Sequence, residues 1–99
     1  MNDQVKQGFY GKVSAEEIIA ELQAHGHNPQ LITEEPGSYL KEHSHQRSHI
    51  IILTDGGLSI TLEGRSFDMK PGDLITIPSN HSHAAESGDN GCKYIWVEM

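Results

Sequence analysis

Four histidines stand at spacings that allow their imidazoles to share a metal ion. His43, His45 and His49 lie in one short stretch, and His83 follows much later, just after the turn-forming residues 78–80. Residues two apart on a strand point to the same face, so His43 and His45 present two nitrogens side by side, and His49 can return to that face after an intervening turn. Imidazole is a common ligand of transition metals. The spacing therefore predicts a metal site that joins two remote parts of the chain.

The composition indicates one small domain that gains from extra support. A chain of 99 residues buries only about 60–65% of its unfolded surface, so a bound metal or a partner subunit would add stability. The single cysteine, Cys92, excludes an internal disulfide and is expected to be a small strand residue in a reducing compartment. Seven basic against fourteen acidic residues give a net charge of −7, which argues against nucleic acid or an anionic membrane as partner.

Neither the N-terminus nor the interior of the sequence predicts a membrane segment. The first six residues contain no apolar signal core, and the longest aliphatic run, residues 50–53, is far too short to span a bilayer. We expect a soluble cytoplasmic protein.

One amphipathic helix is expected near the N-terminus. Ser14 and Glu17 have the spacing of a capping box, and Gly26 supplies a left-handed stop. Apolar residues between them recur at helical spacing: Ala15, Ile18, Ile19 and Leu22. His25 and His27 flank the stop and are expected to be solvated rather than ligands.

The rest of the chain is typical of β-structure, which favours a barrel or sandwich. Leu58, Ile60 and Leu62 alternate with polar residues, as in a half-buried strand. Residues 50–53 are apolar on both faces, which predicts that the helix or another subunit covers the outer face. Together with the small core, this strand predicts a homodimer. Eight strands are expected, at residues 30–34, 38–42, 49–54, 58–63, 65–70, 73–77, 82–87 and 93–98.

The histidines belong to two spaced patterns that resemble the two motifs of the cupin superfamily. The patterns are Gly37-x5-His43-x-His45-x3-His49-x6-Gly56 and Gly72-x5-Pro78-x-Asn80-x2-His83. The resemblance, to small single-domain bacterial cupins, covers residues 29–98. It implies an all-β, cupin-type jelly-roll β-barrel at residues 29–99, preceded by an N-terminal segment and one short α-helix at residues 1–28. It also implies a divalent metal held by His43, His45, His49 and His83, and often a dimer.

Three residues depart from the family pattern. His49 stands where a glutamate is usual, as in a subgroup of manganese-binding cupins. Asn80 replaces a glycine, and Asn tolerates a left-handed turn. Ser87 replaces an asparagine, which puts only a turn or strand-end contact in doubt.

The histidine at position 49 changes the expected chemistry. Four neutral imidazoles leave the full +2 charge on the ion, so bound water or a substrate oxygen becomes more acidic than beside a carboxylate ligand. Mn or Fe is favoured, and Ni, Co, Cu or Zn is possible. An octahedral ion keeps two open positions, whereas Zn closes at four ligands and is structural.

Other residues near the motifs are weaker candidates. His81 shares the strand parity of His83 but is expected at the pocket mouth. Arg47 could clamp a substrate carboxylate, although a solvated turn arginine is the simpler interpretation. Several large side chains are expected to be mostly core, with some lining any cavity: Tyr39, Phe67, Met69, Ile75, Tyr94 and Trp96.

Two functions remain open. The first is a metal-dependent enzyme, of dioxygenase type or alternatively an isomerase, lyase or decarboxylase, acting on a small oxygen-rich molecule that chelates the metal. The second is a non-catalytic metal- or metabolite-binding module. No residue is singled out as catalytic.

Overall fold

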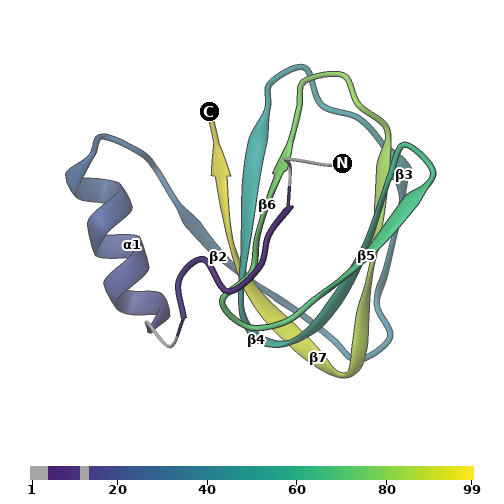
Figure 1. Ribbon diagram of the computed structural model, residues 1–99, viewed down its shortest axis with the longest axis horizontal. Coiled ribbons are helices and arrows are strands. Elements are labelled where there is room, and N and C mark those ends of the chain that lie inside the picture. Colours follow the sequence, from purple (N-terminus) through teal and green to yellow (C-terminus); the bar gives the residue numbers. More distant parts are fainter. Residues whose placement is uncertain (1–4, 12–13) are drawn as a thin grey trace.

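The computed structural model describes residues 5–11 and 14–99, and it shows an all-β jelly-roll barrel with one short helix (Figure 1). Figure 1 shows the helix lying to one side of the barrel. In chain order the elements are β1 (Val5–Lys6), α1 (Ala15–Ala24), β2 (Gln30–Glu34), β3 (Tyr39–His43), β4 (His49–Leu62), β5 (Arg65–Met69), β6 (Leu74–Ile77) and β7 (His83–Glu98).

Two long antiparallel strands, β4 and β7, form the backbone of the barrel. Each runs through a bend, where their register shifts between Leu53 and Asp55 and again between Gly56 and Leu58. Gly56 has a φ of 77° and lies against Gly91, so close that a Cβ on Gly56 would overlap the Gly91 carbonyl oxygen. Bulges bend a strand without ending it, so β4 and β7 each contribute to both halves of the barrel.

The bend divides the barrel into two halves, one on each side of it, and β4 and β7 run through both. In the first half, the N-terminal part of β4 lies between β6 and β7, with β1 and β2 at the two edges. In the second half, the C-terminal part of β4 and the beginning of β7 are flanked by β5 and β3. The core between the halves consists of Ile51, Leu53, Leu58, Ile60, Leu62, Met69, Ile75, Ile77, Ala85, Cys92 and Tyr94, with Val5, Ile32, Phe67 and Trp96 packed against it.

Helix α1 covers the outer face of the first half. Its residue Ile18 is only 2% exposed and belongs to a second apolar cluster that includes Ile52 of β4, Leu74 of β6 and Ile95 of β7. This contact accounts for the apolar outer face of residues 50–53 within one chain. That strand therefore no longer supports a homodimer, which stays a prediction.

Both ends of helix α1 carry the capping residues that the sequence predicts. The Glu17 amide donates to Ser14 Oγ at 3.2 Å, and the hydroxyl in turn lies 3.1 Å from Glu17 Oε1. The Glu17 carboxylate thus accepts from the Ser14 hydroxyl, where a capping box would have it accept from the Ser14 main-chain amide. At the other end, Gly26 adopts a left-handed φ of 87°.

The described part of the N-terminal segment packs on its own barrel. Strand β1 pairs with β6, and the Gly8 amide donates to Asp73 Oδ1 at 2.7 Å. The other carboxylate oxygen of Asp73, which is buried, accepts from the Lys70 amide at 2.9 Å. Residues 1–4 and 12–13 of that segment lie outside the described residues.

The predicted strands agree with the structure except in three places. Residues 49–54 and 58–63 form the single strand β4, and residues 82–87 and 93–98 form the single strand β7. The predicted breaks at residues 55–57 and 88–92 were wrong, because the strands bend at Gly56 and Gly91 and then continue. The short strand β1 was not predicted, since two residues carry no periodicity. Within the described ranges, no helix has the length and apolarity needed to cross a bilayer.

Ser87, which replaces the asparagine of the motif, makes the turn contact that this replacement put in doubt. Its Oγ accepts from the Ser38 amide at 2.9 Å and donates to the Glu35 carbonyl oxygen. Ser87 thus attaches the turn between β2 and β3 to strand β7 by two hydrogen bonds.

Candidate metal centre

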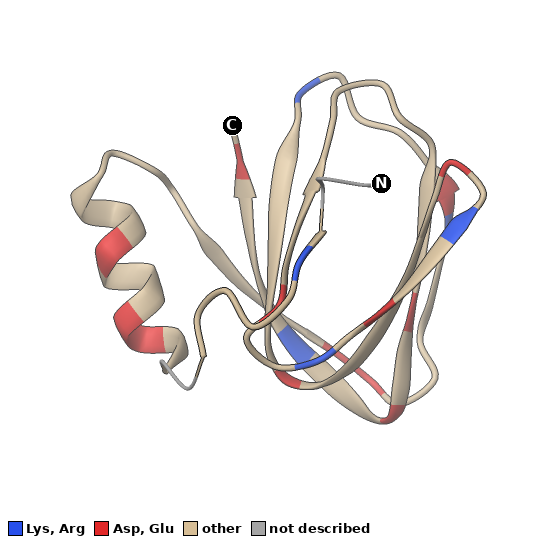
Figure 2. Cartoon of the chain, viewed as in Figure 1, with Lys and Arg blue, Asp and Glu red and all other residues tan. Residues whose placement is uncertain are grey.

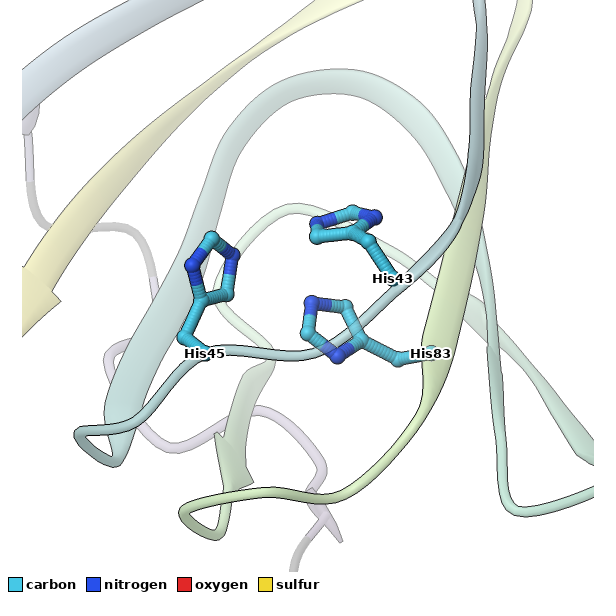
Figure 3. A group of neighbouring side chains, drawn as sticks. All are labelled: His43, His45 and His83. Carbon is cyan, nitrogen blue, oxygen red and sulfur yellow. The ribbon is translucent and has the colours of Figure 1, made fainter.

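Three of the four motif histidines meet at the end of the barrel where β3 ends and β7 begins, which we call the mouth of the barrel. One nitrogen from each of His43, His45 and His83 lies within 4.8 Å of the others. His43 ends β3 directly opposite His83, the first residue of β7, and His45 reaches in from the loop before β4 (Figure 3). The structure therefore brings His83 beside two histidines that lie about 40 positions earlier in the sequence.

Two of these rings are oriented by main-chain carbonyls. Nδ1 of His43 lies 2.5 Å from the Lys41 oxygen, and Nδ1 of His83 lies 3.0 Å from the His81 oxygen. A carbonyl oxygen only accepts, so each bond requires the proton to sit on Nδ1. The lone pair of Nε2 is then free for a metal, which is the usual arrangement of metal-binding histidines.

His45 is held differently. Among the residues that the structure describes, no hydrogen bond to its ring is found. Its main-chain oxygen accepts from the Asn80 amide at 2.7 Å, and Asn80 has the left-handed φ of 60° that its motif position requires. The His45 ring packs against the rings of His49 and Trp96, with centroids 5.0 and 6.3 Å away. Packing and the loop main chain thus determine its position.

His49 lies beside the group of three and not within it. Its ring centroid is 5.0 Å from that of His45, 5.2 Å from that of His83 and 5.3 Å from that of Trp96, and the residue is only 1% exposed. The ring therefore packs against the group of three, but a four-histidine site is not confirmed.

The Nδ1 atom of His49 has an unusual environment. It is enclosed and makes no hydrogen bond of good geometry with any described residue. Burial lowers the pKa of His49, and the nearby main chain of Arg47 offsets only part of that decrease. A buried polar atom without a partner is rare in folded proteins. A ring in this position fits a ligand sphere better than an apolar core.

The surroundings of His49 and His83 favour the neutral form of both rings, because they lower the pKa of each. Burial, with smaller effects from the neighbouring His83 and His45, lowers the pKa of His49 to about 4. Burial likewise lowers the pKa of His83, with smaller effects from His43 and His45. A metal ligand must be unprotonated, so rings that stay neutral at pH 7 bind a cation without first releasing a proton. The donor set of imidazole nitrogens thus fits a divalent transition metal.

The remaining candidates lie at the rim or in the wall. His81 is half-buried, with Nδ1 2.9 Å from the Ser79 oxygen, and it is not part of the cluster. Arg47 donates through Nε and Nη2 to the main-chain oxygen of Met99, at 3.0 and 2.9 Å. Two of its nitrogens are therefore already engaged, and the structure gives no direct support to a substrate clamp.

Most of the large side chains expected in the core are there, with one exception. Tyr39 is 61% exposed, because it pairs with the outward-facing Glu86. The contact of Trp96 with His45 and His49 was not predicted. The only signal available was the alternation of Cys92, Tyr94 and Trp96, which places the indole on the inner face but not beside the histidines.

The family comparison agrees with the motifs. The family model described as "Cupin domain" matches residues 30–98. No curated protein matches the sequence.

Solved structures share the fold at low identity. A cupin superfamily protein from Desulfitobacterium hafniense is 20% identical over 72% of this chain and 64% of its own, with a TM-score of 0.66. DMSP lyase DddQ from Ruegeria pomeroyi is 24% identical over 72% of this chain and 36% of its own, with a TM-score of 0.67. KdgF from a Halomonas species is 24% identical over 73% of this chain and 72% of its own, with a TM-score of 0.61. The match thus spans less than two thirds of the first two proteins.

Proposed function

Because this chain belongs to the cupin family, we propose that it is a metal-dependent enzyme that holds one divalent transition metal at the mouth of its barrel. His43, His45 and His83 are the first three ligands, and His49 is the fourth. The observation that supports this most directly is the convergence of three ring nitrogens within 4.8 Å, two of them on rings whose Nδ1 faces a carbonyl. Mn or Fe is the favoured metal, since both accept six ligands and leave two positions for other molecules.

The fourth ligand follows from the environment of His49. Its side chain is buried among the other three rings, and its Nδ1 lacks a good partner. A small movement of the ring on metal binding brings it into the ligand sphere. No carboxylate then neutralises the ion, which keeps its full charge to polarise a bound oxygen.

The substrate we propose is a small oxygen-rich molecule that chelates the metal, and the reaction is of dioxygenase type. When bound, the metal supplies a Lewis acid with open positions for the substrate and dioxygen. The chain itself orients the ligand rings, through the carbonyls that face His43 and His83 and through the packing of Trp96 against His45 and His49. One of the structurally similar proteins, DddQ, is a lyase, which supports a lyase as the alternative reaction class.

A second candidate is a non-catalytic binding module. The core cluster beside the histidines consists of apolar side chains and Tyr94, so beyond the histidines it offers little acid or base chemistry. In that case the metal would hold the two halves of the barrel together. A homodimer remains part of both proposals, and light scattering at micromolar concentration tests it.

Metal content separates these proposals. The protein is expressed without added metal and purified without a metal-affinity column, and the bound metal is counted and examined by spin resonance. Near one Mn or Fe per chain with exchangeable water ligands supports the enzyme, and His45→Ala should then abolish metal uptake and turnover. A tightly held Zn, together with a large fall in Tm on chelation and no turnover in a broad screen of chelating substrates, favours the binding module. Protein that takes up no divalent metal contradicts the enzyme and favours a module that binds a metabolite instead.

A further inference from the structure

We infer that Arg47 is a positioning residue for the metal centre, because it holds the loop that carries His45. The inference rests on the proposed metal site. Arg47 is exposed and lies two residues beyond His45, and its guanidinium reaches across to the end of β7. An exposed arginine usually contributes little to stability, so the position of its contact matters more than its strength.

The contact is a two-way clamp between the loop and the residue that follows β7. Arg47 donates from Nε and Nη2 to the Met99 oxygen at 3.0 and 2.9 Å. The Met99 amide donates back to the Ser48 oxygen at 2.9 Å. Two neighbouring loop residues are thus tied to one residue about 50 positions away, and a loop held at both its side chain and its main chain has little freedom to shift.

His45 depends on this clamp more than the other ligands do. The rings of His43 and His83 are each fixed by a carbonyl two residues earlier, in or beside the same strand. The described structure holds no such bond for the His45 ring. Its position follows from the loop, which is tied on one side by the Asn80 amide and on the other by the clamp of Arg47.

The main chain of the loop therefore does for His45 what carbonyl bonds do for the other two rings. Loss of a group that orients a metal ligand typically weakens metal binding by about 10- to 100-fold. We expect a change of this size when the guanidinium is removed, although Arg47 touches no metal. The stability of the metal-free protein should change little, because the contact is exposed.

The test compares R47Q and R47K with R65Q, which replaces an exposed arginine at the start of β5. Metal dissociation constants are measured by competition with a chelator, with the spin-resonance spectrum of bound Mn²⁺ as a second readout. R47Q should bind metal about 10- to 100-fold more weakly and broaden the spectrum. R47K should behave like R47Q, because a lysine ammonium cannot direct two N–H donors at the Met99 oxygen from one rigid, planar group. R65Q should match the wild type in both readouts.

A mutant cycle identifies which ligand the clamp serves. Asparagine replaces the ligand histidine in each background, because its amide oxygen leaves a weaker site whose affinity can still be measured. In an H45N background, R47Q should weaken binding by less than about twofold more, whereas in an H43N background it should keep its full effect. Equal effects in both backgrounds, or an R47Q variant that binds metal as the wild type does, overturn the inference alone. Wild-type protein that binds no metal overturns the proposed function and this inference with it. Metal-free Tm values of all variants show whether any change reflects folding.

Discussion

Replacing His49 with leucine should leave the metal-free protein about as stable as the wild type, or more stable, while removing most of its stabilisation by metal. The two effects have opposite signs because of where the ring lies. In the metal-free protein, a nearly fully buried ring leaves its Nδ1 without a good hydrogen bond. In the metal-bound protein, we propose that the same ring is a ligand.

The magnitude follows from these two environments. A buried polar atom without a partner costs about 1–3 kcal/mol, and the imperfect fit of leucine in the place of an imidazole costs up to about 1.5 kcal/mol. The metal-free free energy of unfolding should therefore change by between about −0.5 and +3 kcal/mol. Metal at 100 times its dissociation constant stabilises the wild type by about 2.7 kcal/mol, and a 100-fold weaker site leaves only about 0.4 kcal/mol of that gain.

Urea unfolding with a chelator and with saturating metal measures both terms. H81L is the matched control: His81 is half-buried and its Nδ1 faces the Ser79 oxygen, so its loss should cost about 0.5–1.5 kcal/mol in both conditions and leave the metal increment intact. A H49L variant that keeps the full metal increment would show that His49 is not a ligand. A metal-free H49L variant destabilised by more than about 2 kcal/mol would refute the reasoning from the unpartnered nitrogen.

Three further substitutions test the fold that positions the site, each by urea unfolding of the metal-free protein. G56A should cost at least about 2 kcal/mol more than G64A. Both glycines have left-handed φ values, but of the two only Gly56 would bring a Cβ against the main chain across the bend, with Cys92 Cα at 2.9 Å. Equal losses would argue against a tight bend. D73A should cost about 1–3 kcal/mol for each of the two main-chain amides that lose their acceptor, and a loss below about 1 kcal/mol would contradict that role. S14A should cost about 0.5–2 kcal/mol through loss of the helix cap, and an unchanged free energy of unfolding would contradict a role for the hydroxyl.

Local chemistry explains which elements could be predicted. The helix was predictable because Ser14, Glu17 and Gly26 act within a few residues of their own positions. The division of β4 and β7 was not, because a glycine with positive φ looks the same in sequence whether it ends a strand or bends it. Gly56 bends β4 because Gly91 faces it, and that pairing joins residues far apart in the chain.

The site shows a similar limit. The spacing of His43, His45 and His83 predicted their convergence, since strand parity and the turn before β7 place all three on the inner face. The spacing did not predict that His49 would lie outside the group, because its ring position depends on packing against Trp96. The exposure of Tyr39 was missed for a related reason: the register shift between Leu40 and His43 changes the face on which residues of β3 lie.

The path of β7 links the two halves of the barrel to the metal centre. Its first residue, His83, supplies a ligand in the second half. After the bend, the same strand brings Trp96 against His45 and His49 in the first half, and Met99, just beyond its end, holds the ligand loop.

Both ends of this strand therefore meet at the mouth of the barrel, where the loops at residues 44–48 and 78–82 connect the two halves. Figure 2 shows that Asp and Glu residues are spread over α1 and the strands, with Lys and Arg residues scattered among them. A cation at the mouth would join the halves at the end opposite the bend. Metal binding should then slow hydrogen exchange at both ends of β7 more than at its centre, where the bend already holds β4 and β7 together. Equal slowing along the whole strand would argue that the metal stabilises the barrel globally rather than closing its mouth.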